Sequence, residues 1–261
     1  MTRPTFSRPA FSLPSLNLWG LALLALCALA WQWGAQLYHT PFFPSPLDVL
    51  RASIEQAPEI LSEIGATLRR AAMSLAIALV TMIPFGILCG RIRWVGLVID
   101  PLLEFLTTLP PPAVIPLAML FAGTGDGAKI AVILYSCAPS VLINTLEGVR
   151  QSPAMLDRVA RSLRLSSLET MVLVDLPAAL PPILTGVRLA VGSSLLVAIT
   201  SEMLLSTDGI GTFVQRSQET FRMDGVLAGI LCISLTGLAV NAGLRGLERR
   251  LLFWHHRQPA T

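Results

Sequence analysis

The sequence predicts an all-α membrane protein with six transmembrane helices, and two observations lead to this prediction. Of the 261 residues, 53% are hydrophobic and only 13% are charged, whereas soluble domains carry about 25% charged residues. A helix needs about 20 apolar residues to cross a bilayer. Six segments meet that need, at about residues 18–38, 68–90, 97–121, 127–148, 183–205 and 225–247. Long continuous apolar runs favour helices over strands, because a helix satisfies its own backbone polar groups in lipid.

The first apolar segment, residues 18–38, follows a basic tail of residues 1–17 that looks like the start of a signal peptide. No clear small-residue cleavage site precedes the aromatic residues Trp31, Trp33 and Tyr38. Aromatic residues of this kind prefer the membrane interface. We therefore expect the segment to be retained as the first transmembrane helix.

Residues 39–67 connect the first two spans, and we expect them to lie on the outer, periplasmic side. Their apolar residues recur at helical spacing, with Glu55, Glu59 and Glu63 between them. This pattern predicts an amphipathic helix along the membrane interface. A solvated connector explains the same composition equally well.

The middle of the third apolar segment, residues 107–116, contains four prolines, Pro110, Pro111, Pro112 and Pro116. Proline removes a hydrogen-bond donor and kinks a helix. Broken backbone at membrane depth is tolerated only where protein covers it or where it lines a wet cavity. Pro110, Pro111 and Pro112 are therefore our first candidates for lining a translocation pathway.

Two glycine-rich segments are interpreted as turns and not as nucleotide-binding loops. Residues 122–129 contain the only lysine, Lys129, and do not match the phosphate-loop motif. Gly209 and Gly211 are expected in a turn before an outer helix. The three histidines and four cysteines form no recognisable catalytic or metal-ligating set. We expect no catalytic residue, no metal site and no cofactor in this chain.

The distribution of basic residues predicts the orientation. With the N-terminus inside, twelve arginines fall on the cytoplasmic side and six basic residues fall outside. The cytoplasmic set is Arg3, Arg8, Arg91, Arg93, Arg150, Arg158, Arg161, Arg164, Arg245, Arg249, Arg250 and Arg257. The outer set is Arg51, Arg69, Arg70, Lys129, Arg216 and Arg222. Both termini, including a tail of residues 248–261, are therefore expected in the cytoplasm.

The longest inward-facing connection, residues 150–182, is expected to form an elbow of two short helices. Ser152 before Pro153 predicts a capped helix start. Met155, Val159 and Leu163 then fall on one stripe of this helix, and Asp157, Arg161 and Arg164 fall on the other.

The second helix of the elbow is predicted to start at Ser166, because Ser166 and Glu169 have capping-box spacing. Pro177, Pro181 and Pro182 follow. We expect these prolines to prevent continuation into the fifth span and to make the elbow a rigid body.

The elbow resembles a loop of the permease subunits of ATP-driven (ABC) importers. That loop has Glu-Ala-Ala, a glycine four residues after the second alanine, and ten residues later a hydrophobic residue, any residue, leucine and proline. The corresponding positions here are Arg158, Val159, Ala160, Arg164, Val174, Asp175, Leu176 and Pro177. The similarity covers about residues 68–247, is most specific over 159–213, and points to the sulfonate, nitrate and taurine branch.

Two positions depart from the family pattern. Arg158 stands where the family has an acidic residue, and Arg164 stands where it has a glycine. The charge is reversed at Arg158, and the bend at Arg164 lacks the residue that best tolerates unusual backbone angles. Either the partner ATPase has altered complementary charges, or coupling is weaker than usual.

The resemblance implies a type I importer fold, with a permease core of residues 68–247, in a multi-pass protein of the bacterial inner membrane. It implies a permease homodimer, two nucleotide-binding ATPase subunits that carry ATP and Mg²⁺, a periplasmic solute-binding protein, lipid contacts and no nucleic acid. The elbow residues Arg158, Val159, Ala160, Leu163, Arg164, Val174, Leu176 and Pro177 would seat in the ATPase. ATP binding would then switch the cavity between the two permeases from inward-facing to outward-facing.

Charge inside a membrane span is costly and by default suggests function, and three such residues are candidates: Glu104, Arg188 and Glu202. Glu104 is expected to pair with another helix, with Arg188 as one partner, rather than to contact a ligand. Arg188 could equally be an interfacial anchor, because arginine can snorkel. Glu202 matches a position that is commonly acidic in the family and could pair across the bundle.

The function expected from this resemblance is ATP-driven import of a small solute, such as a sulfonate, taurine or nitrate. A permease for a heteroaromatic vitamin precursor is the alternative within this class. Outside it, an ATP-independent transporter would show internal repeats and mid-membrane carboxylates, which are not found. A degenerate permease acting as a scaffold would no longer bind an ATPase.

Overall fold

A computed structural model describes residues 18–38, 40, 42–205 and 207–252. Every regular element in this part of the chain is helical, which confirms the all-α class. The elements are α1 (Leu18–Tyr38), α2 (Pro46–Glu55), α3 (Ala57–Arg91), α4 (Arg93–Thr108), α5 (Pro111–Ala122), α6 (Asp126–Arg150), α7 (Ala154–Ser162), α8 (Ser167–Thr170), a π-helix η1 (Met171–Asp175), α9 (Leu176–Leu205), α10 (Ile210–Glu219) and α11 (Met223–Leu251).

Three long helices, α3, α6 and α9, pack together as the core of the molecule. Their contact positions carry small residues: a Cβ atom on Gly148 of α6 would lie 2.5 Å from Pro182 of α9. Conversely, a Cβ atom on Gly186 of α9 would lie 2.8 Å from the backbone oxygen of Ser140 of α6. Glycine therefore permits the close approach of α6 and α9.

The connector between the first two spans contains the amphipathic helix α2, whose start is a capping box between Ser45 and Asp48. The hydroxyl and backbone N–H of Ser45 donate to Asp48 and hold the pKa of that carboxyl below its ordinary value. The second long helix, α3, begins at Ala57 and not at about residue 68. Only Gln56 separates it from α2, so most of the predicted connector is helical.

The third apolar segment is not a kinked helix but two separate helices with a sharp bend between them. Helices α4 and α5 meet at an angle of 95°. Leu109 and Pro110 between them have extended backbone angles, and the proline that follows each of them disfavours the helical region. The run of prolines thus folds one predicted span into a bent pair, and Ile115 of α5 is buried against α6 and α9.

The predicted stop before the fifth span is wrong. The helix runs from Ser167 through the π turn η1 to Leu205 without a break, and Pro181 and Pro182 lie inside it. In η1 the N–H of Leu176 donates to the carbonyl of Met171, five residues back. This wider turn directly before Pro177 relieves the clash that a proline ring makes with the preceding turn. The second arm of the elbow, α8 with η1, therefore continues directly into α9.

Four helices in the described residues are long and apolar enough to cross a membrane: α3, α6, α11 and the continuous helix of residues 167–205. The bent pair α4 and α5 makes a fifth span if it is counted as one. The remaining predicted span, the first, corresponds to α1, a 21-residue helix without charged residues, so the total of six spans stays a prediction. Within the described chain, the Trp31 indole donates to the carbonyl of Pro44 and links α1 to the start of α2.

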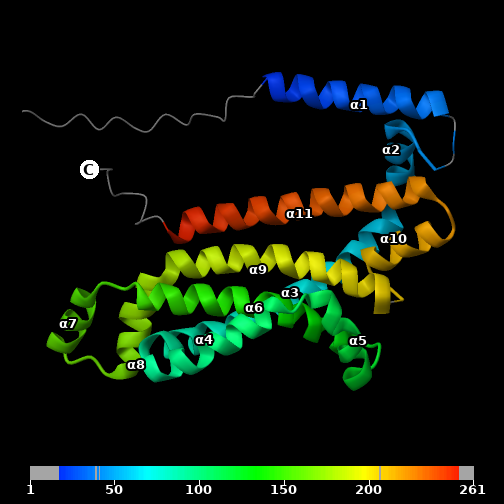
Figure 1. Ribbon diagram of the computed structural model, residues 1–261. Coiled ribbons are helices and arrows are strands. Elements are labelled where there is room, and N and C mark those ends of the chain that lie inside the picture. The colour runs from blue at the N-terminus through cyan, green and yellow to red at the C-terminus, as the bar shows by residue number, and fades with distance from the viewer. Residues whose placement is uncertain (1–17, 39, 41, 206, 253–261) are drawn as a thin grey trace, which may run out of the picture.

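The long helices run side by side, with different short elements at their two ends (Figure 1). Helices α7 and α8 lie at one end, called here the elbow end. Helices α2 and α10 lie at the opposite end. The N-terminal end of α1 and the C-terminal end of α11 both lie toward the elbow end.

Candidate functional site

Helix α7 presents an uncovered apolar stripe. The exposed fractions of Met155, Val159 and Leu163 are 73%, 46% and 66%. These residues are four apart and share one face. Beside this stripe, Ala160 is only 2% exposed, so that side of α7 lies against the rest of the molecule. Exposed apolar residues in such a row are typical of a surface that binds another protein.

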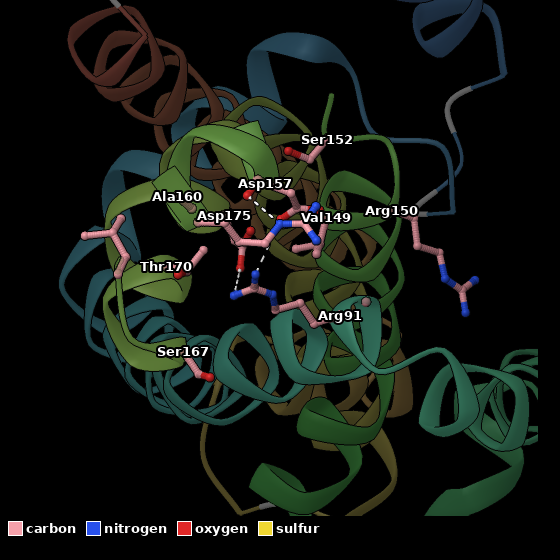
Figure 2. A pocket seen from close by; sticks show the side chains of 12 residues that line it. Arg91, Val149, Arg150, Ser152, Asp157, Ala160, Ser167, Thr170 and Asp175 are labelled. Atoms are coloured by element: carbon pink, nitrogen blue, oxygen red, sulfur yellow. Dashed lines mark hydrogen bonds and ion pairs between the residues drawn. The ribbon is translucent and has the colours of Figure 1, made fainter. Parts of the chain in front are cut away.

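An arginine from the core fastens α7 in place. Arg91, at the end of α3, lies 3.4 Å from Asp157 of α7 and 3.2 Å from Asp175 of η1. Figure 2 shows Arg91 pointing toward these two carboxylates, whereas Arg150 points away from them. Arg91, Asp157 and Asp175 line a cavity of about 620 Å³. Both arms of the elbow are thus tied to α3 through one guanidinium group.

The N-terminal cap predicted for the first elbow helix is wrong by one residue, and that predicted for the second is confirmed. Pro153 is the cap of α7, and no side chain caps that helix. Pro153 has extended backbone angles and cannot itself be the first helical residue. At α8 the capping box between Ser166 and Glu169 is present in both directions.

Arg164 has the backbone conformation for which the family uses glycine. Its φ is +53°. The N–H of Arg164 donates to the carbonyl of Arg161, and that of Leu165 donates to Ala160. These two bonds form a Schellman motif, in which the residue with positive φ is usually glycine. The bend therefore forms without glycine, and Arg164 adopts the energetically unfavourable left-handed backbone conformation.

Replacing Arg164 with Gly is expected to stabilise the chain by about 1 kcal/mol, because a side chain in the left-handed region costs about 1–2 kcal/mol. Thermal unfolding in detergent should show a midpoint higher by about 2–4 °C. Phe221 provides the matched control, since it ends α10 in the same motif with φ +56°. Its ring packs edge-on against Phe42, so F221G should give no gain. An unchanged unfolding midpoint for R164G would contradict the inference that Arg164 strains the backbone.

The other predicted elbow residues divide into two groups. Arg158 is exposed beside the apolar stripe, and Pro177 is exposed at the start of α9. Val174 and Leu176 are half-buried, and Leu176 packs on the core cluster that contains Ile183 and Val187. The exposed part of the elbow is therefore α7 with its following bend, whereas Leu176 attaches the elbow to the core.

At the opposite end of the core lies a buried charge network centred on Arg70 of α3. Arg70 is 1% exposed, and Glu202 of α9 is fully buried. The guanidinium donates to Glu202 over 2.8 Å, to Asp126 of α6 over 2.8 Å and to Asp208 over 2.6 Å. One arginine thus joins α3, α6, α9 and the segment before α10.

The remaining oxygen of Glu202 is also satisfied. It accepts from the hydroxyl of Thr67 over 2.7 Å and from the N–H of Gly211 over 3.2 Å. Gly209 has φ +107°, and a Cβ atom there would lie 2.2 Å from the Glu202 carboxyl carbon. The predicted turn is present at Gly209, whereas Gly211 is already the second residue of α10. Both glycines lie against Glu202.

Sequence reasoning missed Arg70 and Asp126 and counted Arg70 only as an outer charge. Lys129 lies 3.4 Å from Asp126 and 3.7 Å from Asp208, so it belongs to the same network. Arg69, next to Arg70, is 60% exposed and meets only Asp126. Two adjacent arginines at the edge of an apolar helix do not reveal which one is buried. Helical spacing from Thr67, Ala71 and Ser74, which are all buried, was the available signal.

The pairing suggested between Glu104 and Arg188 does not form. Arg188 forms an ion pair with Glu248 of α11. Glu104 is exposed on α4, a helix that packs on α3 and α6 rather than on α9. Helix α11 brings Glu248 to the half-exposed Arg188 instead.

Pro110, Pro111 and Pro112 lie where α4 and α5 meet. Pro110 is exposed and Pro111 is half-exposed. The hydroxyl of Tyr135 on α6 donates to the carbonyl of Leu106 over 2.7 Å and supports the end of α4. In the described residues no group of three or more histidine, cysteine, aspartate or glutamate side chains could hold a metal ion.

The described chain is thus a bundle of several helices able to cross a membrane, with an exposed elbow that Arg91 ties to the core. Residues 82–253 match the family "Binding-protein-dependent transport system inner membrane component". The chain belongs to this family of ABC importer permeases, and to its sulfonate, nitrate and taurine branch. It is a multi-pass inner-membrane component of a transporter and not itself an enzyme.

Three relatives illustrate the branch. The taurine transport system permease protein of Escherichia coli is 34% identical, over 84% of this chain and 82% of that protein. A bicarbonate transport system permease protein of Synechococcus elongatus is 37% identical over 72% and 68%. A putative aliphatic sulfonates transport permease protein of Bacillus subtilis is 32% identical over 82% and 78%.

Proposed function

We propose that this chain forms the translocation pathway for a small anion and that α7 docks on a separate ATPase subunit. Three relatives are named for the transport of taurine, bicarbonate and aliphatic sulfonates. These solutes are all small and carry an anionic group. The observation that carries the docking role is the exposed stripe of Met155, Val159 and Leu163 at the elbow. A groove on a nucleotide-binding subunit that holds ATP and Mg²⁺ would cover this stripe, while a solute-binding protein delivers the anion outside.

In the orientation that we propose, the elbow lies on the cytoplasmic side, and so do the N-terminal end of α1 and the C-terminal end of α11. Arg70 and Arg91 are 21 residues apart on α3, which is about 32 Å along a helix. This distance matches the roughly 30 Å thickness of a hydrocarbon core. The two charge clusters would then lie at the two membrane faces, with the Arg70 network outside.

Movement of the elbow would reach the outer face through one continuous helix. The arm that begins at Ser167 continues to Leu205, about 57 Å along the axis. Its far end carries Glu202, to which Arg70 is bound. A displacement of α7 by the ATPase that carries α8 with it would therefore shift the element that holds the outer ends of the core together. In a homodimer, two such levers would open and close the pathway, with Pro110, Pro111 and Pro112 as candidates for its lining.

Replacing Arg91 with Gln is expected to lower uptake severalfold while ATP hydrolysis by the assembled transporter continues. The change removes the ion pairs that tie Asp157 and Asp175 to α3, so α7 can move without moving the core. Uptake and hydrolysis are measured together in reconstituted vesicles. Arg150 is the matched control, because it lines the same cavity but pairs with Asp100 and Glu147 outside the elbow. Equal uptake per ATP in R91Q and R150Q would remove the coupling role of Arg91.

The proposed function is tested by gentle purification in detergent. We expect a nucleotide-binding subunit to co-purify with vanadate-sensitive ATPase activity. Cysteines introduced as M155C or V159C should cross-link to that subunit. Failure of both co-purification and cross-linking would leave an ATP-independent transporter or a scaffold. Uptake of labelled taurine, an alkanesulfonate, bicarbonate and nitrate then identifies the anion.

A further inference from the structure

A pocket between α9 and α11 at the elbow end carries an excess of positive charge. Its volume is about 370 Å³, and its lining includes Arg188, Arg245, Arg249 and Glu248. The single carboxylate is engaged by Arg188. Among the residues that the structure describes, no acidic side chain pairs with Arg245 or Arg249. Two guanidinium groups are therefore available to an external anion.

The pocket lies at the depth of lipid headgroups. Helix α11 has no charged residue between Asp224 and Arg245, and this stretch is roughly 30 Å long, which is the thickness of the hydrocarbon core. Arg245 and Arg249 follow directly after it. Leu189 of α9 and Leu247 of α11 are largely exposed on either side, and they offer apolar surface to acyl chains.

The elbow half of α11 has few contacts with the rest of the described chain. The residues of α11 that are buried, Gly225, Ala228 and Gly229, all lie in its outer half. Toward the elbow end, Leu244 packs partly on the core cluster, and Glu248 meets Arg188. A ligand bound in the pocket would add to the few contacts that hold this end of α11 against α9.

We propose that this pocket binds the phosphate of an anionic phospholipid from the cytoplasmic leaflet. The proposal rests on the orientation given with the proposed function. Guanidinium groups bind phosphate oxygens through paired, charge-assisted hydrogen bonds. Basic pockets between transmembrane helices on the cytoplasmic side are suited to such headgroups. The lipid phosphate lies between Arg245 and Arg249, and the ion pair of Arg188 with Glu248 forms the inner wall of the site.

The test measures lipid binding by the full chain in a neutral detergent, without ATPase or substrate. Phosphatidylglycerol is expected to raise the unfolding midpoint more than phosphatidylcholine does, and native mass spectrometry should show retained phosphatidylglycerol. The double variant R245Q/R249Q should lose most of this preference. Arg250 is the matched control, because it is exposed on the same helix but does not line the pocket. R250Q should keep the preference.

Three outcomes would overturn the lipid site. The preference for phosphatidylglycerol could be absent from the unsubstituted chain, or it could be equal in R245Q/R249Q and R250Q. Inorganic phosphate could also stabilise the chain as much as the lipid does, which would identify a site for a soluble anion. Because no ATPase or substrate is present, a failed transport assay and a failed lipid assay are separate results.

Discussion

Replacing Leu163 with Asp is expected to abolish uptake while the protein still inserts and folds. Leu163 ends the apolar stripe of α7 and is 66% exposed, so the carboxylate meets water in the isolated chain. In the assembled transporter the same carboxylate would be buried in an apolar groove, and burial of an unpaired charge is costly. The expected readouts are loss of ATPase co-purification and loss of uptake, with an unchanged unfolding midpoint.

The matched control is Arg161→Asp, which places a carboxylate on α7 two residues away. Arg161 is exposed and lies on the face of α7 opposite Met155 and Val159, so R161D should retain uptake. Loss of uptake in both variants would mean that any negative charge on α7 is harmful, and normal uptake in L163D would rule out docking through the stripe. Leu176→Asp is unsuitable for this test, because Leu176 packs on the core cluster and its replacement would damage folding.

Local patterns in the sequence predicted the parts of the elbow that local interactions determine. The stripe of α7 follows from residues four apart, and the capping box at Ser166 follows from spacing within one turn. The predicted stop at Pro177, Pro181 and Pro182 failed for a different reason. Proline usually ends a helix, but the π turn before Pro177 and the glycine opposite Pro182 accommodate the rings. Neither feature is visible from the prolines themselves.

The charge network could not be assembled from sequence, because its members are far apart in the chain. Glu202 was a candidate for pairing across the bundle, but its partner Arg70 is 132 residues away. The pairing depends on how α3 and α9 align lengthwise, and that alignment is set by packing along the whole core. For the same reason the suggested pair of Glu104 and Arg188 was wrong, since α11 supplies Glu248 instead.

Replacing Arg70 with Met is expected to lower the free energy of unfolding by about 3–5 kcal/mol, because removal of one partner leaves a buried charge uncompensated. Glu202 is fully buried, and its remaining donors are Thr67 and the N–H of Gly211. Chemical unfolding in detergent measures the loss. Arg69→Met is the matched control. Arg69 is 60% exposed and pairs only with Asp126, so R69M should cost at most about 1 kcal/mol.

The double variant R70M/E202Q separates the ion pair from simple packing. E202Q keeps a side chain of the same shape and removes the charge that Arg70 compensates. If the buried pair dominates, R70M/E202Q should be more stable than the sum of the single losses predicts, because the uncompensated carboxylate is gone. Additive losses would mean that Arg70 acts mainly through Asp126 and Asp208, which are half-exposed and can be hydrated. In that case the outer end of the core is held by the segment before α10 and not by the pair of α3 with α9, and the lever from the elbow would act on that segment.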